Sequence, residues 1–260
     1  MSRRFRVWRD LFQFLVVVAA CSWLLARGSE KLGYNWQWYR VPRYLYTFED
    51  GRFVAGPLLD GLAVTFKISG ISLLLAFAFG LVTALLRLSP SFVGRLLARG
   101  YLELIRNTPL LVQIFFIYFV LGPVLDLERF TAAVLALSLF EGAYASEIFR
   151  SGILSIPAGQ WEAAYCLGLS SFSTYRWIIL PQAVRRILPP LTGQAVSLVK
   201  DSALVSTIAI YDLTMQGQAI ISETFLTFEL WFTVAALYLA VTLTLSVVVN
   251  IMERKFKINV

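Results

Sequence analysis

Long apolar segments alternate with shorter polar ones along most of this 260-residue chain. An apolar run of about 20 residues crosses a hydrocarbon core of about 30 Å as a helix. Only helices and closed barrels satisfy their backbone hydrogen bonds in lipid, and runs of this length are helical. The pattern therefore predicts an all-α integral membrane protein with about six transmembrane helices, over residues 11–26, 58–87, 101–123, 130–150, 187–210 and 228–250.

The first apolar segment follows a strongly basic N-terminus with arginines at positions 3, 4, 6 and 9. A basic region before a short apolar run is also typical of a signal peptide, and Val18–Cys21 resembles a lipoprotein cleavage box. The segment stays apolar through Leu25, past the cysteine. We therefore expect a retained spanning helix, and cleavage of residues 1–26 is the alternative.

The distribution of basic and aromatic residues predicts the orientation of the helices. Residues 28–57 form a polar connector rich in Trp and Tyr, which favour the membrane–water interface. Arginines follow the second apolar segment and flank residues 150–186, and basic residues mark the cytoplasmic side. We expect the connector outside the cytoplasmic membrane and both termini inside, although the connector itself carries three arginines.

Composition removes several classes of function. Hydrophobic residues make up 58% of the chain and charged residues 15%, against about a quarter charged in soluble domains. The net charge of +7 fits the basic flanks of a membrane protein better than nucleic-acid binding. The chain has no histidine, which excludes catalysis by histidine, histidine-based zinc sites and histidine proton relays. Cys21 lies in an apolar segment and Cys166 in the polar segment 159–181, so the two would lie at different depths relative to the membrane and no disulfide framework is indicated.

The polar segment 159–181, GQWEAAYCLGLSSFSTYRWIILP, lies between the fourth and fifth apolar segments. Ser155 or Gly159 can begin a short helix, in whose first turns Glu162 meets the positive end of the helix dipole. Gly168 suits the left-handed residue that ends many helices.

Pro181 can then open the next helix, where its missing N–H costs little. The segment thus predicts a helix, a turn and a second helix, with a small apolar surface at Ala163 and Ala164. Either another protein docks on this surface, or the helix lies on the membrane surface as an amphipathic element.

The spacing of this segment matches a longer pattern. It fills every position of E-A-A-x3-G-x9-I-x-L-P and resembles the EAA loop of bacterial ABC-importer permeases. Residues 103–113 resemble the E-x-x-R-x-T-P-L-L-V-Q stretch of amino-acid permeases of this type. The second to sixth apolar segments resemble the five-helix core of type I ABC-importer permeases, a resemblance that covers about residues 57–255.

This resemblance implies the permease subunit of an ATP-driven importer that moves polar amino acids by alternating access. Residues 1–56 would form an extra N-terminal helix and an aromatic-rich periplasmic loop. Residues 57–255 would form the permease domain, with a cytoplasmic coupling loop at 150–186. The ATPase-coupling residues implied by the motif are Glu162, Ala163, Ala164, Gly168, Leu180 and Pro181.

The resemblance also implies partners. Permeases of this family act as homodimers or heterodimers, bind two ATPase subunits and receive solute from a separate binding protein. The chain has no G-x-x-x-x-G-K-[ST] motif, so ATP and Mg²⁺ would bind to the ATPase partner. The chain would then be a transporter subunit without cofactor or metal and not itself an enzyme. Neither the amino acid carried nor the identity of the second permease follows from the sequence.

Ionisable residues within the apolar segments are candidates for the substrate path. Lys200 and Asp201 lie in the fifth segment, where each charge costs at least ~2.5 kcal/mol on insertion. Gln194, Ser197 and Asp201 share one helix face. The functional interpretation is a polar path in which Lys200 meets the substrate carboxylate and Asp201 its ammonium. The alternative is a structural pair, with Lys200 or Asp201 bonded to Glu141 or to another helix.

Two further pairs of charged residues stand three positions apart, on one helix face in each case. They are Glu103 with Arg106 and Glu147 with Arg150. Gating pairs and purely structural ion pairs are both consistent with this spacing.

Two other functions compete with the importer. One is a membrane-anchored scaffold or enzyme subunit that docks a soluble partner through the loop. The other is an ion-coupled secondary transporter, which would show an internal repeat. No repeat of fixed period is seen in the sequence.

Overall fold

The computed structural model describes residues 3–256, without the side chains at 3–8, 10, 21, 25, 26, 29–32, 49 and 253–256. Predictions about Cys21 and about the basic C-terminal residues fall outside these described side chains. The chain forms two compact units, Met1–Tyr39 and Arg40–Val260. The described part is predominantly helical, as predicted, with one short β-hairpin.

The first unit consists mainly of α1 (Arg3–Leu32), followed by the start of the 3₁₀ helix η1 (Trp38–Arg40). The helix is longer than the predicted 11–26 because polar residues at both ends continue it. Its apolar stretch is Leu11–Leu24.

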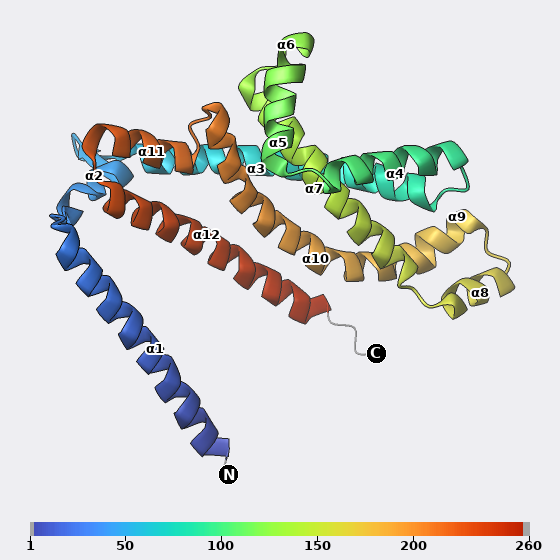
Figure 1. Ribbon diagram of the computed structural model, residues 1–260. Helices are drawn as coiled ribbons and strands as arrows, with labels where there is room; N and C mark the ends of the chain where they lie inside the picture. The colour runs from blue at the N-terminus through green and yellow to red at the C-terminus, as the bar shows by residue number, and fades with distance from the viewer. Residues whose placement is uncertain (1–2, 257–260) are drawn as a thin grey trace. The chain divides into compact units, whose positions relative to one another are not determined.

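The second unit contains all other elements. In chain order they are α2 (Pro42–Leu45), β1 (Tyr46–Glu49), β2 (Arg52–Ala55), α3 (Pro57–Leu88), α4 (Phe92–Arg106), α5 (Leu110–Phe115), the π-helix η2 (Phe116–Leu121), α6 (Gly122–Leu125), α7 (Arg129–Leu154), α8 (Ala158–Cys166), α9 (Ser171–Ser173), the π-helix η3 (Thr174–Ile179), α10 (Leu180–Asp201), the 3₁₀ helix η4 (Ser202–Ile208), α11 (Leu213–Thr224) and α12 (Thr227–Phe256). Figure 1 shows their arrangement.

Three of the predicted spanning helices are present as single long helices. They are α3, α7 and the Thr227–Met252 part of α12, which correspond to the second, fourth and sixth apolar segments. By length and composition these three described helices can cross a membrane, or four if a bent pair counts as one span. The single fifth helix predicted at 187–210 is not formed: α10 ends at Asp201, the 3₁₀ helix η4 follows it, and neither element belongs to this set.

The bent pair replaces the single third helix predicted at 101–123. Helix α4 begins at Phe92, where the Ser91 hydroxyl accepts a hydrogen bond from the Gly94 N–H, and it ends at Arg106. Pro109 is the cap of α5, as its fixed φ and missing N–H predict, and the chain bends by 106° between the two helices. The buried Gln113 side chain donates to the Ile105 carbonyl at 2.7 Å and to the Thr108 carbonyl at 3.1 Å, which holds the bend.

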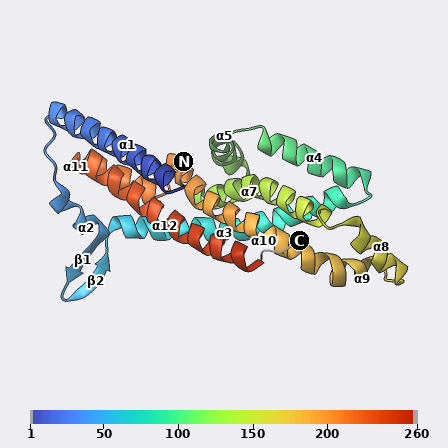
Figure 2. The same cartoon turned by 90° about the horizontal axis from the view of Figure 1, so that it is seen from below.

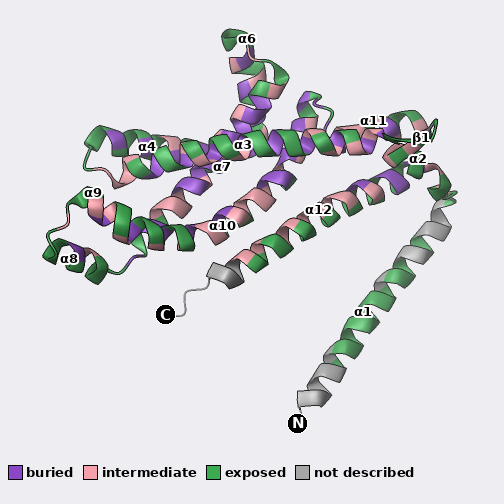
Figure 3. Ribbon diagram, turned by 180° about the vertical axis from the view of Figure 1, so that it is seen from behind, coloured by how far each residue is buried: buried purple, intermediate pink, exposed green. Residues whose placement is uncertain are grey.

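Helices α3 and α7 pack closely along much of their length and bury small residues between them (Figure 3). A Cβ atom on Gly80 would lie 2.8 Å from the Ala145 Cβ, and one on Gly142 would lie 3.0 Å from the Phe79 Cβ. Small residues at such crossings are how membrane helices bring their backbones together. Larger buried side chains, including Ile68, Ile114 and Leu137, form a core between these helices and α5.

The connector contains a β-hairpin that the all-α prediction did not include. Strands β1 and β2 pair antiparallel, with Tyr46 opposite Ala55. Asp50 and Gly51 at the turn have φ of 49° and 71°, the left-handed values that a type I′ turn requires. Figure 2 shows the hairpin at the end of α3 opposite to α8 and α9.

Candidate coupling loop and polar membrane sites

The predicted coupling loop, residues 150–186, contains α8, which follows α7 after a short turn. Ser155 is the C-terminal cap of α7, and α8 starts at Ala158 after Pro157. Neither Ser155 nor Gly159 begins the helix, because the proline already holds the backbone in the extended conformation that precedes it.

Helix α8 ends as the sequence predicts, at a left-handed glycine. Gly168 has φ of 71°. Its N–H donates to the Tyr165 carbonyl at 2.9 Å, and the Leu169 N–H donates to the Ala164 carbonyl at 3.1 Å. These two bonds make a Schellman motif, which satisfies carbonyls that the helix would otherwise leave unpaired.

Pro181 lies in the first turn of α10, as predicted, but the chain before it is already helical. The chain is already helical from Ser171, where the Ser170 hydroxyl accepts from the Ser173 N–H at 3.2 Å. It passes through the π-helix η3 into α10, and the Leu180 N–H donates to the Tyr175 carbonyl, five residues back. The wider π turn accommodates a proline that would break a regular helix.

The loop is a compact knob rather than an extended connection. Ala164 is buried, whereas Glu162, Ala163, Gly168, Leu180 and Pro181 are exposed. The rings of Trp161 and Tyr175 meet edge-on at 5.0 Å and hold α8 against η3.

The knob is largely exposed (Figure 3), and several of its exposed side chains are large and apolar. Leu167 is 79% exposed and Phe172 is 78% exposed. Tyr165 and Trp177 are also exposed. Exposed apolar patches of this kind are typical of surfaces that bind another protein or a membrane.

The predicted path residues lie around a buried acid on α7. Glu141 is fully buried, and its Oε2 atom accepts a hydrogen bond from the Gln194 side chain on α10. Asp201 lies on α10, like Gln194, and its carboxyl group is close enough to Glu141 to interact with it. Among the described residues the Glu141 Oε1 atom has no partner.

The other two predicted path residues are less enclosed. Ser197 is half-buried on α10, and Lys200 is exposed. The structure thus brings together Glu141, Gln194 and Asp201, while Lys200 forms no ion pair within 4.0 Å in the described part of the chain.

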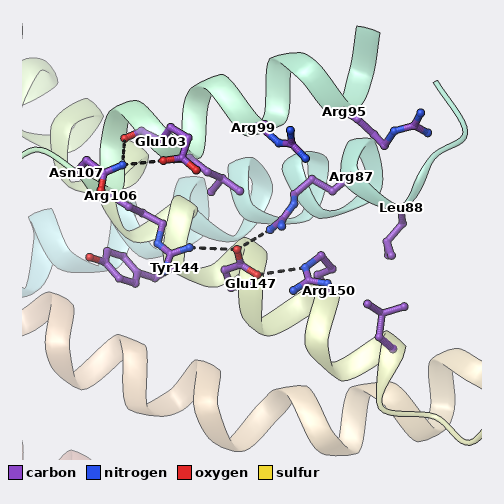
Figure 4. Close-up of a pocket in the computed structure, with 12 residues that line it drawn as sticks. Arg87, Leu88, Arg95, Arg99, Glu103, Arg106, Asn107, Tyr144, Glu147 and Arg150 are labelled. Carbon is purple, nitrogen blue, oxygen red and sulfur yellow. Dashed lines mark hydrogen bonds and ion pairs between the residues drawn. The ribbon is translucent and has the colours of Figure 1, made fainter. Parts of the chain in front are cut away.

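The two predicted charge pairs form only in part (Figure 4). Glu147 accepts from Arg150 at 3.2 Å, as the spacing allows, but also from Arg87 at 2.6 Å and Arg106 at 3.2 Å. Glu103 does not pair with Arg106; it accepts from the Asn107 side chain at 2.8 Å. One carboxylate therefore joins arginines of α3, α4 and α7.

These arginines line a cavity of about 630 Å³ that lies at the C-terminal ends of α3 and α7 and extends along α4. Sequence reasoning missed Arg87 as a member because its partner lies sixty positions away on another helix, and no local spacing indicates such a contact.

Comparison with known proteins shows the family of this chain. Residues 76–258 match the model of the binding-protein-dependent transport system inner membrane component. The glutamine transport system permease protein GlnP of Escherichia coli K12 is 41% identical over 204 residues, which cover 77% of this chain and 93% of that protein. The nopaline transport system permease protein NocM of Agrobacterium fabrum is 39% identical over 207 residues, covering 75% and 86%.

Two solved structures of ABC transporters are also similar to this chain. The crystal structure of an amino acid ABC transporter with histidines matches with a TM-score of 0.73 at 38% identity, covering 76% of this chain and 94% of that chain. An inward-facing structure of the MetNI methionine ABC transporter shares the fold, with a TM-score of 0.67 at 19% identity, covering 78% and 97%. The chain belongs to the family of binding-protein-dependent transport system inner membrane components, as the permease subunit of an ABC importer.

Proposed function

We infer that this permease moves polar amino acids across the cytoplasmic membrane by alternating access, driven by ATPase subunits that dock on the α8–η3 knob. The observation that carries this inference is the exposed apolar surface of the knob around a rigid Schellman turn, within a chain of the importer family. Relatives named for glutamine and nopaline support an amino-acid substrate.

Docking needs a surface that is both exposed and fixed in shape. Glu162 and Ala163 are exposed on α8, and buried Ala164 anchors the helix from the other side. The apolar side chains of Leu167 and Phe172 would be covered by the ATPase. Glu162 would present a negative charge to a basic partner group at the edge of this contact.

The path for the solute would run past the Glu141–Gln194–Asp201 cluster. Two carboxyl groups near one another in the membrane favour a cation between them, and the amino-acid ammonium is such a group. The unpartnered Glu141 Oε1 atom provides an acceptor for it. Lys200, exposed one residue before Asp201, would meet the substrate carboxylate.

The assembly would contain a second permease, identical or related, two ATPase subunits that bind ATP and Mg²⁺, and a periplasmic or surface-anchored binding protein. We place both termini and the knob on the cytoplasmic side, with the aromatic connector outside. The arginines around Glu147 lie at the same end of α7 as the knob, which supports this orientation.

Glu162→Lys tests the docking. Membranes that contain the variant, the ATPase and the binding protein should retain the permease but lose ATPase co-purification and uptake of the amino acid that the binding protein delivers. Glu223→Lys is the matched control, because it reverses an exposed charge on α11, away from the knob. Normal co-purification and uptake with Glu162→Lys would contradict docking at this residue.

Lys200→Met, Asp201→Asn and the double variant test the path. If these residues contact the substrate, each single change depresses uptake, and the double variant does not recover it. A structural role predicts instead that Asp201→Asn, beside Glu141, lowers expression together with uptake, whereas Lys200→Met, at an exposed residue without an ion pair, leaves both unchanged. Full uptake in the double variant would refute the path at these residues.

A further inference from the structure

The cavity around Glu147 carries more positive charge than its own carboxylates balance. Five of the side chains that line it are arginines and two are glutamates, and these are Arg87, Arg95, Arg99, Arg106, Arg150, Glu103 and Glu147. Glu147 already accepts hydrogen bonds from three of the arginines, and Glu103 from Asn107. The cavity therefore retains a net positive charge.

Two of the arginines are not committed to a carboxylate. Arg95 donates to the Ser89 backbone carbonyl at 3.0 Å. Arg99 has no hydrogen bond or ion pair with any described residue, and Figure 4 shows it extending from α4 on the side of Arg87. A guanidinium presents several donors in a fixed fork that matches a phosphate group.

The same helix carries a second face that suits lipid chains. Gly94, Ala98, Leu102 and Ile105 are the buried side of α4, which packs against α3 and α7. A separate apolar strip of α4 is exposed and has no partner in the described chain: Phe92 is 72% exposed and Leu97 is 64% exposed. Val93, Leu96 and Leu104 are also exposed.

We propose that the arginine-lined cavity between α3, α4 and α7 binds the phosphate of an anionic phospholipid, whose acyl chains cover the exposed apolar strip of α4. Basic pockets between helices at the cytoplasmic face are suited to such head groups. A free anion would use the arginines but not the apolar strip beside them. A zwitterionic lipid brings an ammonium group that the arginines disfavour.

The cavity lies near the end of α7 that leads into α8, so a bound lipid would affect the position of the knob. Arg150 lies one turn before the end of α7, and α8 follows that end after a short turn. A phosphate that binds Arg99 of α4 alongside the Glu147 cluster links α4 to the helix that leads into the coupling knob. The lipid would therefore stabilise the arrangement of α3, α4 and α7 that positions the knob.

The test measures lipid binding to the purified full-length permease. The protein is titrated with phosphatidylglycerol and with phosphatidylcholine, and bound lipid is counted by native mass spectrometry. We expect preferential binding of phosphatidylglycerol to the wild type. The Arg95→Gln/Arg99→Gln variant should weaken that binding roughly tenfold or more, because each basic side chain near an anionic lipid contributes about fivefold.

The matched control is Arg43→Gln/Arg52→Gln, which removes the same charge from exposed positions near and on the hairpin and should bind like the wild type. If the double cavity variant does not fold, Arg99→Gln alone removes a side chain with no described partner. Equal binding of both lipids by the wild type, or unchanged binding by the cavity variant, would overturn the proposal. Displacement of phosphatidylglycerol by millimolar inorganic phosphate would also overturn it, in favour of a simple anion site.

Discussion

Glu147 of α7 and Arg106 of α4 lie 41 positions apart in the chain, and their side chains meet at 3.2 Å. Arg87 of α3 binds the same Glu147 oxygen at 2.6 Å. One carboxylate thus ties together the ends of three helices, a stronger connection than an isolated surface pair provides.

The first prediction concerns this carboxylate. Glu147→Gln removes the charge that three guanidinium groups share, and we expect the free energy of unfolding to fall by about 1–3 kcal/mol. Glu103→Gln should change it by less than about 1 kcal/mol, because Glu103 is exposed and bonds only to Asn107. Thermal unfolding of the two purified variants in the same detergent compares them. Equal losses of stability would show that the three-arginine cluster is not a structural centre.

The second prediction separates backbone strain from crowding in the knob. A Cβ atom on Gly168 or on Gly159 would meet nothing within 4 Å, but only Gly168 has a left-handed φ. Gly168→Ala should therefore cost about 1–2 kcal/mol locally and distort the turn. Gly159→Ala lies within α8 and should be neutral or slightly stabilising.

The measurement is stimulation of the ATPase by the permease and binding protein in reconstituted vesicles. Gly168→Ala should reduce stimulation while the permease remains inserted, and Gly159→Ala should not. Loss of stimulation in both variants would indicate that the outer surface, rather than the turn, is sensitive.

The third prediction concerns orientation. Phe48 on the hairpin is 68% exposed and Phe172 on the knob is 78% exposed, at opposite ends of the second unit. In a background with Cys21→Ser and Cys166→Ser, each phenylalanine is replaced by cysteine, and intact cells are treated with a membrane-impermeant thiol reagent. Phe48→Cys should label directly, and Phe172→Cys should label only after the membrane is permeabilised. The opposite pattern would invert the proposed topology.

Sequence patterns predicted the long apolar helices well because hydrophobic length is a local property. The boundaries of α3, α7 and α12 follow from runs of apolar residues that any helix spanning lipid must have. The left-handed Gly168 was predictable for the same reason, since the end of one helix selects it.

The hairpin, the contact between Arg106 and Glu147 and the π-helix do not follow from the pattern of apolar residues. The Asp50-Gly51 turn carries a recognised hairpin signal, but the Trp and Tyr residues around it favour an interfacial loop. The three-residue spacing favours a pair between Arg106 and Glu103, whereas tertiary packing brings Glu147 to Arg106. The π-helix before Pro181 is formed by backbone hydrogen bonds between residues five positions apart, and the spacing of apolar residues does not predict such bonds.

A buried acid outside the long spanning helices underlies the last prediction. Asp212 caps α11, with its Oδ1 atom accepting from the Met215 N–H at 2.8 Å, and it is fully buried. Its Oδ2 atom accepts from the Tyr238 hydroxyl at 3.3 Å. Burial raises the pKa of Asp212 from 3.8 to about 6, and hydrogen bonds from the Met215 and Thr214 N–H groups and the Tyr238 hydroxyl oppose this rise only in part.

Because the pKa of Asp212 is higher in the folded than in the unfolded chain, the folded chain binds the extra proton between about pH 4 and pH 6. The contribution of Asp212 to the free energy of unfolding is therefore largest below pH 4, falls as the pH rises towards 6 and is constant above that. The pKa difference limits this change to about 3 kcal/mol. Asp212→Asn keeps an effective helix cap and removes the titration, so the fall in apparent Tm between pH 5 and pH 7.5 should be smaller than in the wild type. Asp60→Asn, at an exposed position in the first turn of α3, is the control and should leave the wild-type pH dependence unchanged. An Asp212→Asn variant that loses as much stability between pH 5 and pH 7.5 as the wild type would show that another group carries the proton.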